Sequence, residues 1–175
     1  MILEKFLPSA RDSWTWRLAN LMDVFEMAAF VKQSYLLETN PIFELDEKLL
    51  ISSLMKAIID QECNLASCQI MVARNKTNNR LMGWHWLKRG YHLPYVREES
   101  AEAAFAQIDL NLPLRTRVCI LAQMMIQWEM YCRFHHIPLL ASTSIREDYQ
   151  GYVKLHRLAD FQLRGSFAFK RITDA

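Results

Sequence analysis

The residues best placed to do chemistry lie at positions 109–117, which read Asp-Leu-Asn-Leu-Pro-Leu-Arg-Thr-Arg, between a predicted strand and a predicted helix. Pro113 suits the first turn of a helix, where its missing N–H costs no hydrogen bond, and Asn111 can cap that turn. Arg115 and Arg117 then lie in the first turn, where the positive end of the helix dipole opposes their charge. A bound phosphate would remove this conflict, because the free N–H groups of a helix start bind anions. Alternatively, both arginines are solvated or paired with Asp and Glu.

This junction belongs to a predicted alternation of strands and helices between residues 103 and 172. Such alternation is typical of βαβ units, in which strands pair in parallel. The sheet would then open between the strand that ends near Asp109 and the strand that follows. The predicted strands are 103–110, 138–144 and 161–172, and the predicted helices are about 113–134 and 149–160.

The first half of the chain predicts a strand, two helices and a hairpin. A short strand at 2–6 is expected to precede a first amphipathic helix, which Asn40-Pro41 ends. Asp46 is the predicted N-cap of a second amphipathic helix. Two β-rich runs, 68–74 and 80–88, flank a polar loop in the manner of a hairpin. The first helix is read from Leu18, Leu21, Met22, Phe25, Ala29 and Lys32, with Trp14 and Trp16 at its start.

These elements predict a single domain that covers residues 1–175. In the second hairpin arm, Trp84 and Trp86 are expected on one face and His85 on the other, because side chains alternate along a strand. The predicted class is α+β (mixed α/β), with a central mixed β-sheet of about six to seven strands and helices on both of its faces.

Composition restricts the functions that this chain can have. Of its 175 residues 51% are hydrophobic, which is enough for a sizeable core, and a net charge of +2 is too small to favour nucleic acid. Four cysteines without CxxC spacing favour free thiols in a reducing compartment.

Cys132 and His135 could form half a metal site, but no second half has suitable spacing, so we expect no metal. The start lacks an export signal and no apolar run reaches ~18 residues, so we expect a cytoplasmic protein without a membrane segment.

The last third of the chain resembles a known family in its motifs. Residues 153–161 are similar to the penultimate-helix signature of the GNAT superfamily of acyl-CoA-dependent N-acetyltransferases, in which a Leu-Tyr pair is followed by a Phe five residues after the Tyr. Here Leu155, His156 and Phe161 occupy those places, and the order of elements also resembles that superfamily. The segment 164–172 looks like the closing strand of small GNAT-like acyltransferases encoded by tailed bacteriophages. The resemblance implies an acyl-CoA N-acyltransferase-like fold.

The resemblance also implies a coenzyme site, with one departure. The coenzyme loop of the family reads Gln/Arg-x-x-Gly-x-Gly/Ala, but Thr116 and Val118 take its small positions, and no glycine occurs between Gly90 and Gly151. Either arginine side chains compensate by bonding phosphate directly, or the pocket has lost its coenzyme. The implied contacts to acetyl-CoA or another acyl-CoA are Leu110, Leu112, Arg115, Thr116, Arg117, Val118 and Tyr149.

Catalytic roles follow from the same resemblance. His156 takes the place of the tyrosine that protonates the leaving thiolate, and an imidazole can do so near neutral pH; alternatively it is a half-buried histidine that pairs with Asp160. Asp109 could act as the base, directly or through water, or be a solvated strand end. His85 is an alternative base or a packed strand residue. Ser142 and its two successors could bond the coenzyme arm or merely end the strand.

Two functions remain open at this point. The first is an acyl-CoA-dependent N-acyltransferase that moves an acetyl or short acyl group to an amine, with a host protein as an acceptor to consider and a homodimer left open. The second is a catalytically inactive GNAT-fold protein that binds a protein partner in host takeover or in a virion. Basic residues in the C-terminal third are the sole indication of nucleic-acid binding, which we do not expect.

Overall fold

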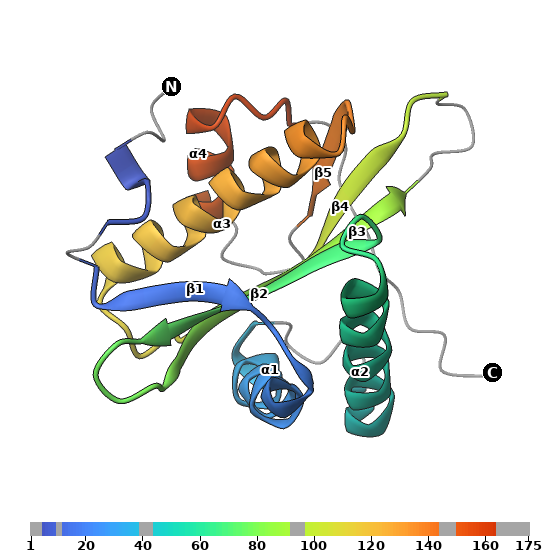
Figure 1. Ribbon diagram of the computed structural model, residues 1–175. Helices are drawn as coiled ribbons and strands as arrows, with labels where there is room; N and C mark the ends of the chain where they lie inside the picture. The colour runs from blue at the N-terminus through green and yellow to red at the C-terminus, as the bar shows by residue number, and fades with distance from the viewer. Residues whose placement is uncertain (1–4, 10–11, 39–43, 92–96, 144–149, 164–175) are drawn as a thin grey trace, which may run out of the picture.

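The computed structural model describes residues 5–9, 12–38, 44–91, 97–143 and 150–163 of the chain. Five strands in this part form one sheet in the order β1-β2-β3-β4-β5 (Figure 1). The first four pair antiparallel, and β4 pairs with β5 in parallel. The strands are β1 Trp14–Leu18, β2 Cys68–Asn75, β3 Leu81–Tyr91, β4 Ser100–Ile108 and β5 Leu139–Ser142.

Helices cover both faces of this mixed sheet, which confirms the predicted class. A core of α1, α2 and the sheet buries Trp84 and Trp86, and a second core on the α3 and α4 side buries Leu87. The predicted alternation in β3 is thereby confirmed. No helix in the described ranges has the length and apolar character needed to cross a membrane. The helices are the 3-10 turn η2 Leu21–Asp23, α1 Val24–Glu38, α2 Glu47–Cys63, α3 Leu114–Phe134 and α4 Gln150–Leu158.

Most predicted elements are confirmed, but the strand count is lower than expected. Asp46 caps α2 by accepting the N–H of Leu49 at 2.9 Å, and the hairpin and the β4-α3-β5 unit lie where predicted. The sheet of the described residues has five strands where six to seven were expected. Of the predicted last strand, 161–163 have no strand conformation and 164–172 lie outside the described residues.

The N-terminal prediction was wrong. The first strand is β1, which contains Trp14 and Trp16, and the predicted strand at 2–6 is not seen in the described residues 5 and 6. The predicted apolar helix face, which includes Met22 and Phe25, is exposed. The buried residues lie on the other side of this segment: Asp23, Val24, Met27, Ala28, Val31 and Ser34.

Close contacts hold the sheet together and hold α3 against it. A Cβ on Gly83 in β3 would lie 2.9 Å from the carbonyl oxygen of Gln107, so the sheet needs glycine here. Buried Gln123 of α3 accepts indole N–H bonds from Trp14 at 2.9 Å and Trp16 at 2.7 Å. These bonds tie β1 to the middle of α3.

His85 packs between β3 and α3 as a neutral core residue. The indole of Trp128 donates to its Nδ1 at 3.0 Å, so its Nε2 carries the proton and donates to Gln127 Oε1 at 2.7 Å. Complete burial lowers the pKa of His85 to about 4, against the opposing effect of the Gln127 bond. The alternative role of His85 as a catalytic base is therefore not supported.

This histidine predicts acid sensitivity of the fold. The pKa of His85 is about 4 in the folded chain and about 6.5 in the unfolded chain. Between pH 4 and pH 6.5 the unfolded chain therefore binds more protons than the folded chain, and stability falls as the pH falls. The free energy of unfolding should fall by about 3 kcal/mol between pH 7 and pH 4 from this group alone. Urea unfolding at both pH values should show that His85→Gln removes this part of the pH dependence. An unchanged pH dependence in the variant would contradict the assignment.

Candidate functional site

Among the described residues, no strand pairs with the second half of β4 on the side where β5 lies. Parallel pairing with β5 starts at Ser100 and ends where Ala103 faces Ser142, yet β4 continues to Ile108. A bulge lies at the same point, because Leu87 pairs with Ala103 and Trp86 with Phe105, which leaves Ala104 between them without a partner. In the described part of the chain, the bulge in β4 therefore coincides with the end of its pairing with β5. The opening that the sequence predicts between these two strands stays a prediction.

The start of α3 lies beyond the end of β4 and has no side-chain cap. Pro113 is the N-cap residue and makes no side-chain cap bond, and the first turn contains no acidic residue. The first helical hydrogen bond runs from the N–H of Arg117 to the Pro113 carbonyl at 3.0 Å, so the amides of residues 114–116 have no acceptor within the helix. The predicted cap by Asn111 is wrong, since its side-chain amide donates to Asp109 Oδ1 at 3.1 Å.

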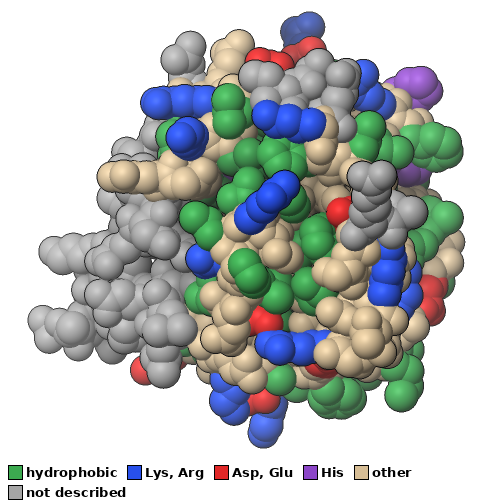
Figure 2. Space-filling view, turned by 90° about the vertical axis from the view of Figure 1, so that its left-hand side faces the viewer, with side chains coloured by type: hydrophobic (Ala, Val, Ile, Leu, Met, Phe, Trp, Pro, Cys, Tyr) green, Lys and Arg blue, Asp and Glu red, His purple; other side chains and the backbone are tan. Residues whose placement is uncertain are grey.

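The side chains of the first turn leave the helix start accessible. Leu114 is 68% exposed and Val118 36%, while Thr116 and Arg117 are half-buried. Within the described residues, the Nε of Arg117 is buried without a hydrogen-bond partner. Figure 2 shows Lys and Arg side chains spread over the side of the molecule on which α3 begins. A helix start with free amides, two arginines and an unsatisfied guanidinium N–H is suited to an anion.

The other predicted coenzyme contacts differ in how exposed they are. Arg115 is exposed beside the open amides, and Leu110 is half-buried in the loop before the helix. Leu112 is half-buried and packs on the α3 core, so part of its side chain has a structural role. Tyr149 lies outside the described residues.

Asp109 has a structural role in place of the predicted role as base. It is buried, pairs with Arg80 and accepts the backbone N–H of Asn111 at 2.9 Å. These bonds hold the loop that leads into α3. Ser142 faces Ala103, six positions before Asp109 along β4, which at ~3.3 Å per residue leaves roughly 20 Å between Asp109 and β5. Asp109 and the groups beside β5 therefore do not share one reaction centre.

His156 is the buried end of a hydrogen-bonded chain between α4 and β5. His156 is 1% exposed, and its Nδ1 lies 2.9 Å from the Tyr152 carbonyl oxygen. Its Nε2 lies 3.1 Å from Ser142 Oγ, which in turn lies 2.5 Å from the Tyr152 hydroxyl. Ser142 and Tyr152 are both half-buried at the end of the paired part of β5. The predicted pairing of His156 with Asp160 is wrong, because both ring nitrogens bond elsewhere.

The direction of the hydrogen bonds in this chain is determined by its acceptors. A carbonyl only accepts, so Nδ1 of His156 carries the proton and the neutral ring has its lone pair on Nε2. Ser142 then donates to Nε2, and Tyr152 donates to Ser142. Burial lowers the pKa of His156 below its usual value, more than the bond to Tyr152 raises it. Burial likewise raises the pKa of Tyr152 to about 12, against the effect of Ser142. The chain therefore ends in a neutral imidazole whose Nε2 accepts the hydrogen bond of Ser142.

Sequence reasoning missed Tyr152 and the bulge at Ala104. The spacing of Tyr152 and His156, four residues apart on a helix, was available as a signal that they share a face. The bulge has no comparable signal, because it depends on the register between β3 and β4. Among the described residues, no group of three or more His, Cys, Asp or Glu side chains could hold a metal ion.

Comparison with solved structures identifies the fold. A transcriptional regulator from Bacillus halodurans is 15% identical, with a TM-score of 0.67 over 91% of this chain and 99% of its own. A predicted acetyltransferase with acetyl-CoA from Clostridium acetobutylicum is 10% identical, with a TM-score of 0.67 over 90% and 96%. An aminoglycoside antibiotic 6'-N-acetyltransferase from Acinetobacter baumannii is 14% identical, with a TM-score of 0.63 over 91% and 99%.

These likenesses extend over almost the whole of each structure. At such low identity they establish the fold, which is acyl-CoA N-acyltransferase-like, and leave the chemistry to the site. No protein-family model and no curated protein sequence matches this chain.

Proposed function

We propose that this protein is an acyl-CoA-dependent N-acyltransferase that moves an acetyl or another short acyl group to an amine. The observation that carries the proposal is the open edge of β4, with the uncapped start of α3 at one end and the Tyr152-Ser142-His156 chain at the other. A solved structure of the same fold contains acetyl-CoA. An anion site and a proton acceptor on one open strand edge are what acyl transfer from a phosphorylated thioester needs.

The coenzyme would be held at the start of α3. The amides of residues 114–116, the exposed Arg115 and the unsatisfied Nε of Arg117 would bond its phosphates. Thr116 and Val118 narrow this place relative to glycine; Thr116 is half-buried and Val118 is exposed. The thioester supplies the activated acyl group.

The hydrogen-bonded chain would move the proton of the reaction. As the amine nitrogen bonds to the acyl carbon, its proton passes through Tyr152 and Ser142 to Nε2 of neutral His156. The C–S bond then breaks, and the imidazolium returns the proton along the same chain to the thiolate. His156 is thus base first and acid second, which extends the acid role expected from the sequence. Backbone N–H groups at the bulge beside Ala104 would stabilise the oxyanion.

An arginine substitution tests the coenzyme site. Arg117→Gln should weaken acetyl-CoA binding by about 10- to 100-fold, because a hydrogen bond from a charged donor contributes about 1.5–3 kcal/mol. Isothermal titration calorimetry measures the dissociation constant. Arg133→Gln is the matched control, since Arg133 is exposed in the last turn of the same helix and contacts Glu129 at 3.5 Å. Equal dissociation constants in both variants would contradict the proposed site.

An exposed apolar surface favours the alternative, an interaction protein of the same fold. Leu18, Leu21, Met22 and Phe25 lie within eight positions of one another, and all four are exposed, Met22 to 87%. Exposed apolar residues in such a group mark contact surfaces between proteins. The two functions differ in their response to acyl-CoA: a protein that has only this role does not bind it.

A further inference from the structure

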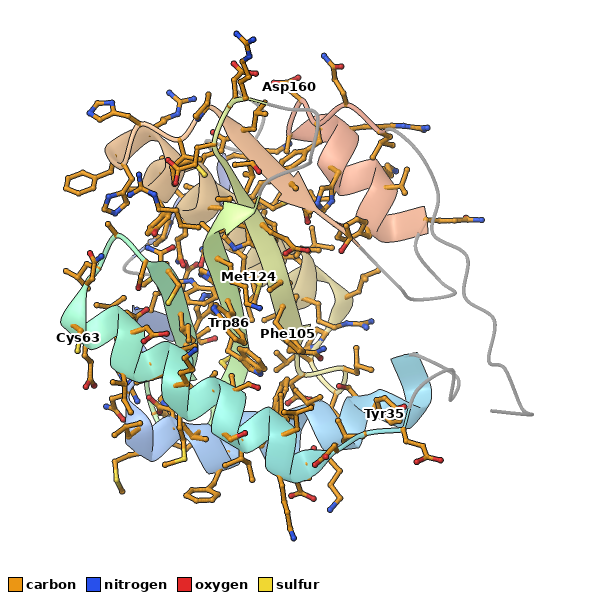
Figure 3. All side chains as sticks on the ribbon, turned by 90° about the vertical axis from the view of Figure 1, so that its right-hand side faces the viewer. Tyr35, Cys63, Trp86, Phe105, Met124 and Asp160 are labelled. Carbon is orange, nitrogen blue, oxygen red and sulfur yellow. The ribbon has the colours of Figure 1, made fainter. Side chains whose placement is uncertain are left out.

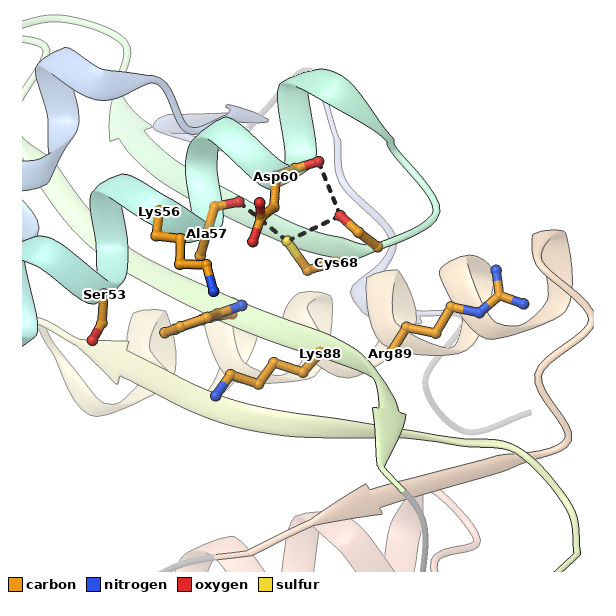
Figure 4. Close-up of a pocket in the computed structure, with 9 residues that line it drawn as sticks. Ser53, Lys56, Ala57, Asp60, Cys68, Lys88 and Arg89 are labelled. Atoms are coloured by element: carbon orange, nitrogen blue, oxygen red, sulfur yellow. Dashed lines mark hydrogen bonds between the residues drawn. The ribbon is translucent and has the colours of Figure 1, made fainter.

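A hollow lies on the opposite face of the sheet from α3 and α4. It has a volume of about 300 Å³ and is enclosed by α2, the start of β2 and the second half of β3 (Figure 4). Its position is close to the open edge, because Trp86 in its wall pairs with Phe105, the residue after the bulge at Ala104. The lining residues that matter here are Ser53, Lys56 and Asp60 of α2 with Trp86, Lys88 and Arg89 of β3.

The hollow is positively charged. Lys56 and Lys88 extend into it from α2 and β3 (Figure 4), and within the described residues neither has a carboxylate in ion-pair range. Arg89 bonds both carboxylate oxygens of Glu99, at 2.6 and 3.0 Å, so its charge is largely compensated. Asp60 is the single acidic residue in the lining, which leaves the two lysines with an excess of positive charge.

Aromatic rings connect this charge to the reaction centre. The Nζ of Lys88 lies 4.4 Å from the centre of the Trp86 ring. Trp86 and Phe105 lie side by side on the face that α2 covers (Figure 3), with ring centres 6.1 Å apart and planes within 8°. A molecule in the hollow would thus have the carbon surface of Trp86 to pack on, and Phe105 lies on the other side of that ring, toward the edge of β4.

We infer that this hollow binds the acyl acceptor, and that the acceptor is an amine that also carries a carboxylate or phosphate group. The inference rests on the proposed function: acyl-CoA would enter from the α3 side and the acceptor from the α2 side, so that both meet at the unpaired edge of β4. Lys56 and Lys88 receive the anionic group, and Trp86 packs against the carbon chain that leads to the amine. The amine nitrogen then points along the sheet edge toward the thioester.

Matched pairs of small probes test this inference without acyl-CoA. β-Alanine and phosphoethanolamine carry the anionic group, and β-alaninamide and ethanolamine lack it. The signal of the Trp86 indole N–H in ¹⁵N NMR titrations reports occupation of the hollow. We expect both anionic probes to shift this signal at lower concentrations than their neutral partners, and a preference for one anion identifies which group the acceptor carries. Equal affinity for anionic and neutral probes would overturn the inference.

Lysine substitutions locate the interaction. Lys56→Gln and Lys88→Gln should each weaken binding of the anionic probes about fivefold, as expected for partly exposed charge pairs. Lys48→Gln, an exposed lysine of α2 outside the hollow, is the control and should bind as the natural chain does. If all three variants bind alike, the inference is wrong. Titration of the same samples with acetyl-CoA separates this inference from the proposed function. If acetyl-CoA does not bind but the anionic probes do, the proposed function fails and the hollow remains an anion site. If acetyl-CoA binds and the probes do not, the inference fails alone.

Discussion

The variant His156→Gln is expected to lose acyl transfer by about 10²- to 10⁴-fold while it retains its affinity for acyl-CoA. Nε2 of His156 is the final acceptor of the chain that begins at Tyr152, and glutamine cannot take up a proton at this place. His156 does not lie at the start of α3, where the coenzyme phosphates would bind. The measurement is single-turnover release of free thiol from acetyl-CoA, alongside a calorimetric dissociation constant.

Two further variants keep this prediction falsifiable even though His156 is buried. Ser142→Ala interrupts the same chain at a half-buried position, with less risk to folding, and should lower the rate to a similar extent. Arg157→Gln alters the exposed neighbour of His156 on α4 and should leave the rate unchanged. Full activity of Ser142→Ala would show that the proton does not travel along this chain. An NMR titration of His156 should also give a pKa below 6.5, as its burial requires.

The largest loss of stability is expected from Asp23→Ala, at about 3–5 kcal/mol. Asp23 is buried and accepts two bonds from Arg17 at 2.7 Å, one from Arg74 at 2.6 Å and one from the N–H of Asn20 at 2.9 Å. Arg74 is itself buried, so removal of the carboxylate leaves a buried guanidinium with one fewer partner. Its remaining carboxylate, Glu26, is exposed. Urea unfolding measures the difference in free energy.

A surface ion pair supplies the matched comparison. Glu47→Gln removes the partner of Lys32 at an exposed site and should cost less than about 1 kcal/mol. Addition of Arg74→Met to Asp23→Ala should recover part of the loss, because it removes the unpaired charge. A loss for Asp23→Ala as small as that for Glu47→Gln would show that the buried network contributes little.

Local patterns were sufficient to predict the hairpin and the β4-α3-β5 unit. The hairpin follows from a polar loop between two β-rich runs, and the β4-α3-β5 unit follows from two strands around a long apolar helix pattern. The N-terminal segment differs because both sides of 18–34 are apolar. Helical spacing selects Leu18, Met22 and Phe25 as readily as Val24, Met27 and Val31, and packing against α2 and the sheet selects the second set.

Two arginines of the candidate site lie where their sequence position indicates, but the hydrogen-bond partners of the other site residues could not be predicted. Arg115 and Arg117 lie at an open helix start, as their sequence position indicates. The role of His156 depends on Ser142, fourteen residues away, and on the Tyr152 carbonyl, and no sequence pattern specifies which nitrogen faces which partner. The partner of Asp109 was unpredictable for the same kind of reason, because Arg80 comes from the other end of the β3-β4 pair.

The most direct test of this account is a ¹⁵N NMR titration of the natural chain with acetyl-CoA. Backbone N–H signals of Leu114, Arg115, Thr116 and Arg117 should shift together and saturate with one dissociation constant, and those at the bulge of β4 should follow. Absence of any shift at millimolar acetyl-CoA, or shifts confined to residues away from the start of α3, would contradict the claim that this helix start receives the coenzyme.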